Sequence, residues 1–215
     1  MGKSVYSIVL DDDVIKMIDI MAAQHGTSRS NMINRILAQQ ISVPTAETMI
    51  NDIYSSIDRF FAGHSSLALA LQNGGSMINM RSALQYKYNP SVKYAVEIYE
   101  NSAYLGQLKV SVRSQKPQLL NIFEQFFTLW AALEMNCCGI NEDEFAIEQG
   151  RYSRIIRLCD NSNYTGYGDS IAGYINLLDK AMKEFFACYA VSPAMAAENV
   201  QRIYLADLTN NISRL

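Results

Sequence analysis

Cysteine and histidine, the residues best suited to metal, redox or acid–base chemistry, are few and scattered in this chain. They are four cysteines and two histidines: Cys137, Cys138, Cys159, Cys188, His25 and His64. No cysteine pair has the C-x-x-C spacing of a zinc site, and neither histidine is close to a cysteine in sequence. We interpret the cysteines as free thiols of the core. The alternative is a soft-metal or redox sensor built on Cys137 and Cys138 with a third cysteine. We expect no metal and no cofactor.

No catalytic motif stands out either. The chain lacks the G-x-S-x-G elbow of serine hydrolases and the H-E-x-x-H motif of zinc proteases. The glycine-containing stretch at residues 161–168 does not continue into the G-x-x-x-x-G-K pattern of a phosphate-binding loop. Two histidines leave little scope for acid–base catalysis by imidazole. We therefore predict that the protein is not an enzyme.

Basic side chains form two groups that would suit an anionic partner. In residues 84–113 four cations share the polar side of alternating runs with one acid: Lys87, Lys93, Lys109 and Arg113, with Glu97. That surface would suit DNA or an anionic ligand, but such lysines equally keep a small open sheet soluble and block pairing at its edges. Arg151, Arg154 and Arg157 share one face if their segment is helical, where they would hold a phosphate or pair with local glutamates.

Residues 45–215 have the periodicities of an α+β domain. Apolar residues at helical spacing predict these helices: about 45–63, a shorter one at 65–71, 117–138, 171–189 and 193–212. The strands of a three-stranded antiparallel meander with one wet face are predicted where apolar and polar residues alternate: 84–88, 92–99 and 107–113. Residues 141–160 fit another helix, interrupted by Gly150, although residues 149–158 fit a fourth strand equally well. Such a domain senses a ligand or sets the oligomer.

Composition sets the outer limits. The chain has 215 residues, of which 49% are hydrophobic and 18% charged, with a net charge of −3 and a pI of about 5.4. These values are ordinary for a globular protein and allow a small terminal module plus one larger domain. No apolar run approaches the roughly 18 residues of a membrane span, and the start has no signal-peptide core. We expect a cytoplasmic protein with no membrane partner.

The first ten residues predict a strand that has no partner in its own domain. Residues 3–10 alternate, with Tyr6, Ile8 and Leu10 on one side. Such a strand cannot satisfy its backbone alone, and the module that contains it is too small to bury a core. Two copies that pair their strands antiparallel and pack four helices beneath them solve both problems. We therefore expect a homodimer or a higher even oligomer.

Two helices follow this strand. Three aspartates at residues 11–13 suit the positive start of the first helix, and Gly26 suits the left-handed residue that ends it. Ser28 is the natural cap of the second helix, which runs to about residue 40. Residues 1–43 thus form a strand–helix–helix module, and residues 41–45 with Pro44 link it to the domain at 45–215.

This module resembles the ribbon-helix-helix family, the fold of the Arc, MetJ and CopG-type repressors. The resemblance covers residues 3–41 and rests on these features: the strand ending at Leu10, the acidic turn, Val14-Ile15, and Gly26-Thr-Ser-Arg-Ser-Asn-Met-Ile33. It implies a strand-swapped dimer that binds DNA. The residues that it places in the major groove are Lys3, Val5, Ser7 and Val9. Those whose backbone N–H groups it places on a DNA phosphate are Ser28, Arg29 and Ser30.

Two features of the module depart from that family. Among the outward strand residues Val5, Ser7 and Val9, Ser7 alone can hydrogen-bond a base, while valines contact thymine methyl groups. The module is also not basic, because four cations balance four acids: Lys3, Lys16, Arg29 and Arg35 against Asp11, Asp12, Asp13 and Asp19. DNA-binding proteins gain much of their affinity from neutralising phosphates. A module that only dimerises therefore stays an alternative.

The sequence predicts an α+β protein with an N-terminal ribbon-helix-helix module and a C-terminal helical domain that contains the three-stranded meander. We expect a dimeric, sequence-specific DNA-binding transcriptional regulator, a repressor, whose domain at 45–215 binds an effector or sets the oligomer. Its partners would be DNA, a second copy of the chain, and a small-molecule or protein effector. One alternative is an antitoxin, or a plasmid partition or mobilisation accessory protein, that binds a protein partner. The other is an assembly protein that uses the module only to dimerise.

Overall fold

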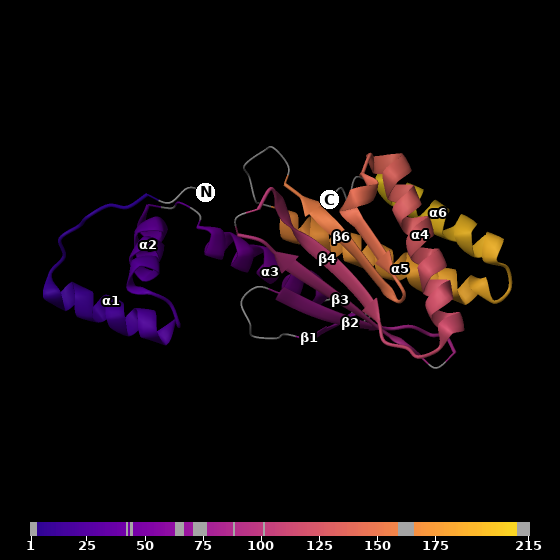
Figure 1. Cartoon of the computed structure of the whole chain (residues 1–215), viewed down its shortest axis with the longest axis horizontal. Helices are drawn as coiled ribbons and strands as arrows, with labels where there is room; N and C mark the ends of the chain where they lie inside the picture. Colours follow the sequence, from indigo (N-terminus) through magenta and orange to yellow (C-terminus); the bar gives the residue numbers. More distant parts are fainter. Residues whose placement is uncertain are drawn as a thin grey trace. The chain divides into compact units, whose positions relative to one another are not determined.

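The computed structural model describes residues 4–41, 43, 45–62, 67–70, 77–87, 89–100, 102–158 and 166–209, with the backbone alone at 67–70. These residues form a mixed α+β protein (Figure 1) that divides into two compact units, Met1–Asn51 and Asp52–Leu215. The boundary falls inside the helix α3 (Ala46–Ala62), whereas the sequence places the linker at residues 41–45. Lys3 and Pro44 lie outside the described residues.

The first unit contains two helices joined by a short turn. α1 (Asp12–Gln24) and α2 (Arg29–Gln40) lie where the sequence predicts them. Ser28 caps α2, because its side-chain oxygen accepts a hydrogen bond of 3.3 Å from the backbone N–H of Asn31. Gly26, in the turn, has a φ of +59°, a left-handed conformation that glycine adopts without strain. The predicted roles of Gly26 and Ser28 are therefore confirmed.

The apolar core of this first unit is small. One cluster contains the buried residues Ile18, Ala22 and Met32, and the half-buried apolar residues packed on them are Leu10, Met21, Ile33 and Ile36. The other buried apolar residues described in this unit are Ala38, Met49 and Ile50. Residues 4–10 lead into this cluster as an extended segment that is assigned to no strand in the single chain. The cluster around Ile18 and Met32 therefore lies where α1 meets α2.

The second unit is built on an antiparallel sheet of six described strands. They are β1 (Leu67–Ala70), β2 (Met77–Ala83), β3 (Ser91–Ile98), β4 (Tyr104–Val112), β5 (Phe145–Glu148) and β6 (Arg151–Arg157). Their order across the sheet is β1-β2-β3-β4-β6-β5, with every neighbouring pair antiparallel. Even-numbered residues of β3, β4 and β6 are buried except Tyr104 at the start of β4, and odd-numbered ones are mostly exposed or half-buried. The sheet therefore has one dry face and one wet face.

Helices cover the dry face. These are α3, α4 (Pro117–Cys138), α5 (Tyr167–Tyr189) and α6 (Pro193–Thr209), and Figure 1 shows α5 passing behind the strands. The ring of Phe127 on α4 stacks on Tyr152 of β6 with centroids 5.2 Å apart. The Tyr94 hydroxyl of β3 donates to Asp179 of α5 at 2.9 Å. Because Tyr94 and Tyr152 both belong to the buried set, α4 and α5 lie on the same side of the sheet.

The predicted three-stranded meander is only partly correct. The runs at 92–99 and 107–113 are indeed β3 and β4, but the run at 84–88 is not a strand. The strand before β3 is β2, and the chain then turns: the Leu84 N–H bonds the Pro90 carbonyl, and the Asn89 N–H bonds the carbonyl of Tyr86. Asn89, with a φ of +41°, takes a turn conformation that a strand cannot accommodate. Residues 84–87, 89 and 90 therefore belong to the connection that closes the β2–β3 hairpin.

The helix predicted at residues 141–160 is wrong. A short 3₁₀ turn, Glu142–Glu144, leads into β5, and residues 149–150 connect β5 to β6 as a two-residue hairpin loop. Gly150, with a φ of +71°, supplies the conformation that such a loop needs. Arg151 and Arg157 consequently lie on the wet face and Arg154 on the dry face. The three arginines therefore do not form one group on a common face. Residues 67–70 are likewise a strand, where a short helix was expected.

The remaining helices lie close to their predicted bounds. α4 begins at Pro117 in the first turn and ends before Gly139, which has a φ of +64°. Among the helices of the described residues, none combines the length and the apolar character that crossing a bilayer requires.

Candidate functional site

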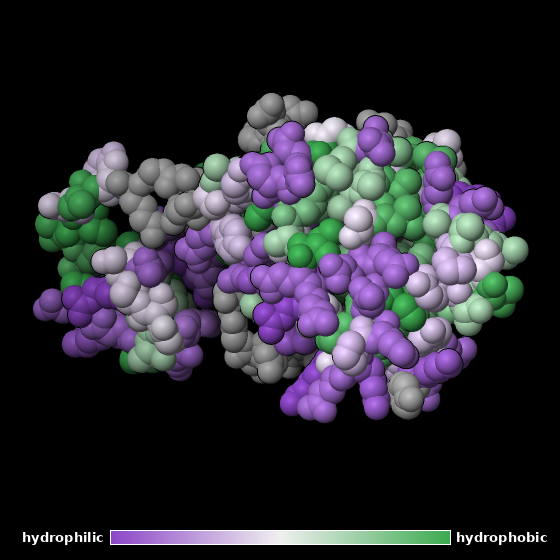
Figure 2. Space-filling model, turned by 45° about the vertical axis from the view of Figure 1, so that its right-hand side comes forward, coloured by the Kyte–Doolittle hydropathy of each residue, from purple (hydrophilic) through white to green (hydrophobic). Residues whose placement is uncertain are grey.

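Exposed apolar side chains are concentrated in the first unit. Ten large ones are exposed in its described residues: Val5, Tyr6, Ile8, Val9, Val14, Met17, Ile20, Leu37, Ile41 and Val43. Those exposed in the described part of the much larger second unit are Tyr104, Val191, Met195 and Leu205. Figure 2 shows some of the apolar atoms of the first unit in green. An apolar surface of this density marks an interaction site.

Two exposed side chains of residues 4–10 differ from the sequence-based expectation. Tyr6 is 83% exposed and Ile8 is 56% exposed, although both lie on the side predicted to be dry. Leu10, two residues further along, is half-buried against the core cluster of α1 and α2. Because side chains of an extended chain alternate, Leu10 fixes the side to which Ile8 and Tyr6 belong. The side that the sequence predicts to be dry is therefore partly covered at Leu10 and exposed to solvent at Ile8 and Tyr6.

The opposite side of the segment holds the predicted base-reading residues. Val5 and Val9 are each 100% exposed, and Ser7 between them is exposed as well. In the structure these three side chains are all open to solvent, as are Tyr6 and Ile8. Lys3 lies outside the described residues.

The predicted phosphate-binding residues lie at the start of α2. Ser28, Arg29 and Ser30 are all exposed there. The first N–H groups of any α-helix lack partners within the helix, so this end can receive an anion. The Ser28 side chain occupies one of these groups, the N–H of Asn31.

The guanidinium group of Arg29 is already bound to an acid. Its Nε and Nη2 donate to the two carboxylate oxygens of Asp19 on α1, both at 2.6 Å. This hydrogen bonding lowers the pKa of the Asp19 carboxyl below its usual value. The sequence reasoning missed this pair, because the two residues are ten positions apart and meet only after the turn at Gly26 folds α2 onto α1. Arg29 is therefore a charge-compensated residue at the predicted site.

A second polar cluster lies buried in the other unit. The side chains of Glu134 on α4 and Arg154 on β6 are each 2% exposed, and their Oε1 and Nε atoms are 3.0 Å apart. The hydroxyls of Tyr152 and Tyr174 both donate to Oε2 of Glu134 at 2.9 Å. The Trp130 indole N–H donates to the Tyr174 hydroxyl at 2.8 Å. We call these five residues the Glu134 cluster.

The Glu134 cluster joins elements rather than opening to substrate. Burial raises the pKa of Glu134, and Arg154 together with the two tyrosine hydroxyls opposes that effect. The hydrogen bonds tie α4 and α5 to β6 across the core. The sequence signal was weak, since Glu134 is simply one polar residue four positions after Trp130 in an aromatic-rich helix. With its two charged side chains almost fully buried, the cluster is a structural centre of the second unit.

Cysteine and histidine form no site in the part of the chain that the structure describes. No group of three histidine, cysteine, aspartate or glutamate side chains gathers there as metal ligands would. The thiols of Cys137, Cys138 and Cys188 are free; Cys137 is exposed and the other two are half-buried, so they are not the core thiols expected. Cys159 and His64 lie outside the described residues.

Two features of the first unit are therefore the strongest candidates: the exposed apolar segment 4–10 and the capped start of α2. Both features come from residues that the sequence analysis selected, and the Asp19–Arg29 pair is an addition to them. In comparisons with protein-family models, with curated proteins and with solved structures, no match to this chain was found.

Proposed function

We propose that this protein is a homodimeric, sequence-specific DNA-binding regulator of transcription. Residues 4–10 of two copies pair as an antiparallel ribbon of the ribbon-helix-helix type, and the ribbon enters the major groove. The observation that carries the proposal is the exposure of Tyr6 and Ile8 on the side of the segment that leads into the core. A single chain leaves these side chains in water, and the same segment of a second chain would cover them.

Dimerisation solves two energetic problems at once. The extended segment exposes backbone N–H and C=O groups that a paired strand would satisfy. Burial of Ile8 and Tyr6 adds roughly 1.5–3 kcal/mol for each large apolar side chain removed from water. The symmetry is two-fold, since one surface pairs with its own copy.

The outward side of such a ribbon would read bases through Val5, Ser7 and Val9. Ser7 can donate to or accept from a base edge, and the two valines fit thymine methyl groups. Base recognition would thus use one hydrogen-bonding side chain, Ser7, flanked by two apolar contacts. A repressor of this kind would prefer sites in which thymines flank one specified base pair.

Phosphate binding would rely on backbone groups more than on charge. The exposed start of α2 offers the N–H groups of residues 28–30, while the charge of Arg29 is offset by Asp19 at 2.6 Å. A protein that neutralises few phosphates releases few counterions on binding. We expect a salt dependence that is shallow for a DNA-binding protein.

Selection from a randomised duplex library tests this function, because it needs no knowledge of the operator. The full chain should enrich duplexes with a two-fold symmetric pattern, and the enriched sites should contain thymines at fixed positions in each half. A dimeric protein that enriches no sequence would contradict DNA recognition. That outcome would favour the assembly protein that uses the module only to dimerise. Val5 and Val9 agree with that alternative, because valine cannot hydrogen-bond a base.

A further inference from the structure

The wet face of the six-stranded sheet carries a row of cations that crosses four strands. Cα pairing aligns Arg81 of β2 with Lys93 of β3, Lys93 with Ser111 of β4, and Ser111 with Arg151 of β6. Neighbouring strands are about 4.8 Å apart, so these side chains are close neighbours on one face. Three of the four carry a positive charge. We call Arg81, Lys93, Ser111 and Arg151 the basic row.

Two members of the basic row are like charges placed directly opposite one another. Arg81 and Lys93 are Cα partners, an arrangement that destabilises a sheet. Among the described residues neither forms an ion pair. The acids of this face pair with other cations of the same face: Glu97 binds Lys109 at 2.8 Å, and Glu148 lies 3.8 Å from Arg151 of the basic row. A bound anion would relieve the repulsion between Arg81 and Lys93.

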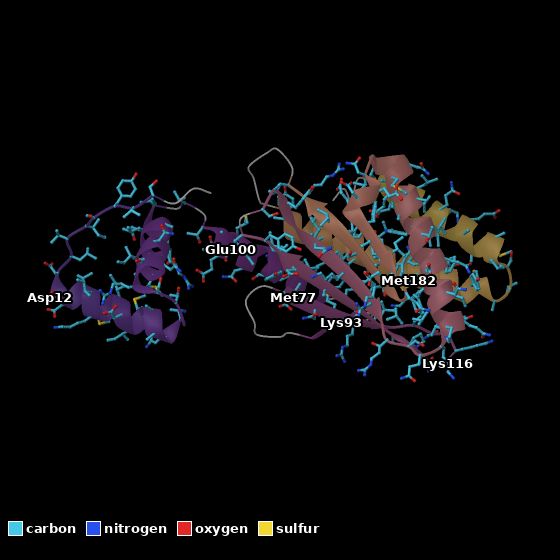
Figure 3. The ribbon with its side chains drawn as sticks, in the orientation of Figure 1. Asp12, Met77, Lys93, Glu100, Lys116 and Met182 are labelled. Atoms are coloured by element: carbon cyan, nitrogen blue, oxygen red, sulfur yellow. The ribbon has the colours of Figure 1, made fainter. Side chains whose placement is uncertain are left out.

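A hollow of about 430 Å³ lies on the same face. Small side chains line it, namely Ala95, Ser111, Ala146 and Ser153. Three cations and one acid stand around them, namely Lys93, Lys109, Arg151 and Glu148. Figure 3 labels Lys93 and Met77, which line the hollow from β3 and β2. Alanine and serine leave room for a ligand above the strands, while the Ser111 and Ser153 hydroxyls can donate hydrogen bonds to it. The volume is that of a small-molecule site.

We propose that this hollow binds a small organic or inorganic polyanion bearing phosphate or carboxylate groups. Charge complementarity selects the class of ligand, because the lining has three cations against the single acid Glu148 and adds the hydroxyl donors of Ser111 and Ser153. The lining has one aromatic residue, Tyr152, whose ring packs on Phe127 beneath the sheet. Single-stranded nucleic acid is bound by stacking bases on exposed rings, and this face offers none along the hollow. The site belongs to the second unit and does not depend on DNA binding by the first.

Binding of inorganic pyrophosphate to the full chain tests this site. Calorimetry should show saturable binding, with sodium chloride at matched ionic strength as the reference. Lys93→Gln should weaken it by roughly tenfold or more, because a charge-assisted hydrogen bond is lost. Lys180→Gln is the matched control, since Lys180 is an exposed lysine on α5. The affinity of this variant for pyrophosphate should equal that of the unaltered chain.

A thermal scan separates a ligand site from a merely solvating surface. Without pyrophosphate, Lys93→Gln should melt no lower than the unaltered chain, since a like charge opposite Arg81 is removed. With pyrophosphate, the unaltered chain should gain stability and Lys93→Gln should gain much less. No saturable binding, or equal weakening in Lys93→Gln and Lys180→Gln, would overturn the proposal. So would a Lys93-dependent affinity for a short DNA duplex in the absence of pyrophosphate binding.

Discussion

The guanidinium group of Arg29 and the carboxylate of Asp19 form a two-pronged ion pair across the turn between α1 and α2, with both hydrogen bonds at 2.6 Å. The pair holds Arg29 beside the start of α2, where a DNA phosphate is proposed to bind. It also withdraws from that site the one cation within the predicted phosphate-binding residues. If the proposed function holds, an acid of the same unit limits the affinity for DNA.

Removal of this acid should strengthen DNA binding. Asp19→Asn frees the charge of Arg29, so affinity for the enriched duplex should rise and the slope of log K against log salt should steepen by about one. Asp13→Asn is the matched control, because Asp13 is another exposed acid of α1. Its carboxylate pairs with Lys16 at a distance of 3.0 Å and makes no ion pair with Arg29. Fluorescence anisotropy at several salt concentrations measures both. Equal effects of the two substitutions would show that net charge alone acts, and not the position of Arg29.

The same pair should fail in acid. Hydrogen bonding to Arg29 lowers the pKa of Asp19 in the folded state. The pair therefore contributes its stability above the unfolded pKa of aspartate, about 4, and loses it as the pH falls through the lower folded value. An NMR titration of the Asp19 carboxyl should give a pKa below that of aspartate in a model peptide. The Arg29→Gln variant should return the Asp19 pKa toward the model value, and an unchanged pKa would contradict the pairing in solution.

Substitutions on the two sides of residues 4–10 should have different effects. Ile8→Asp places a charge in the proposed dimer core and should yield a smaller species in sedimentation. Val5→Asp lies on the outward side, so it should leave the dimer intact and abolish DNA binding by repelling phosphates. Both residues are exposed in the single chain, so a difference between them requires the second copy. If both variants stay dimeric, the ribbon is not the dimer contact.

Base reading by Ser7 should be local. Ser7→Ala removes the one hydroxyl of the outward side and should cost roughly 1 kcal/mol of discrimination or a little more at a single base pair. Affinity for duplexes altered elsewhere should stay unchanged. A panel of single-base variants of the enriched duplex, measured against both proteins, gives the position. A uniform loss over the whole panel would point to a backbone contact instead.

The Glu134 cluster should behave as one unit in folding. Glu134→Leu leaves Arg154 buried without its carboxylate, and breaking a buried pair in this way costs roughly 3–5 kcal/mol. The double variant Glu134→Leu with Arg154→Met should lose much less than the sum of the single losses. Urea unfolding can be followed by the fluorescence of Trp130, the one tryptophan of the chain, which lies in the cluster. Additive losses would mean that the two side chains stabilise the fold independently.

Local signals explain why the two helices of the first unit were predictable. Ser28 caps α2, and Gly26 takes the left-handed conformation of the turn after α1. Both features depend on near neighbours in the chain, so the residue types alone predict the cap and the turn. The wet face of β3 and β4 was predictable for a similar reason, because Lys93 and Lys109 follow the alternation of the strand. What the sequence could not reveal were contacts between distant residues.

The contact between Arg154 of β6 and Glu134 of α4 is the clearest case. Alternation in Tyr152, Arg154 and Ile156 is interrupted by an arginine at a buried position, and arginines at a spacing of three also fit a helix. Arg154 is tolerated there only because Glu134, twenty positions earlier, supplies the opposite charge. Arg81 was missed for a related reason, since β2 has the polar Asn79 and Ser82 buried and so lacks a clear alternating pattern. The basic row became visible only once the register of four strands was known.

Hydrogen exchange at residues 4–10 tests the proposed ribbon most directly. In the single chain these residues belong to no strand and their side chains are mostly exposed, so their amides would exchange within seconds. Pairing with a second copy would bury and hydrogen-bond alternate N–H groups. We expect slow exchange of this segment in the full chain, with protection that falls on dilution and disappears in Ile8→Asp. Rapid exchange at every concentration, or protection that Ile8→Asp leaves intact, would contradict the ribbon and the DNA-binding function built on it.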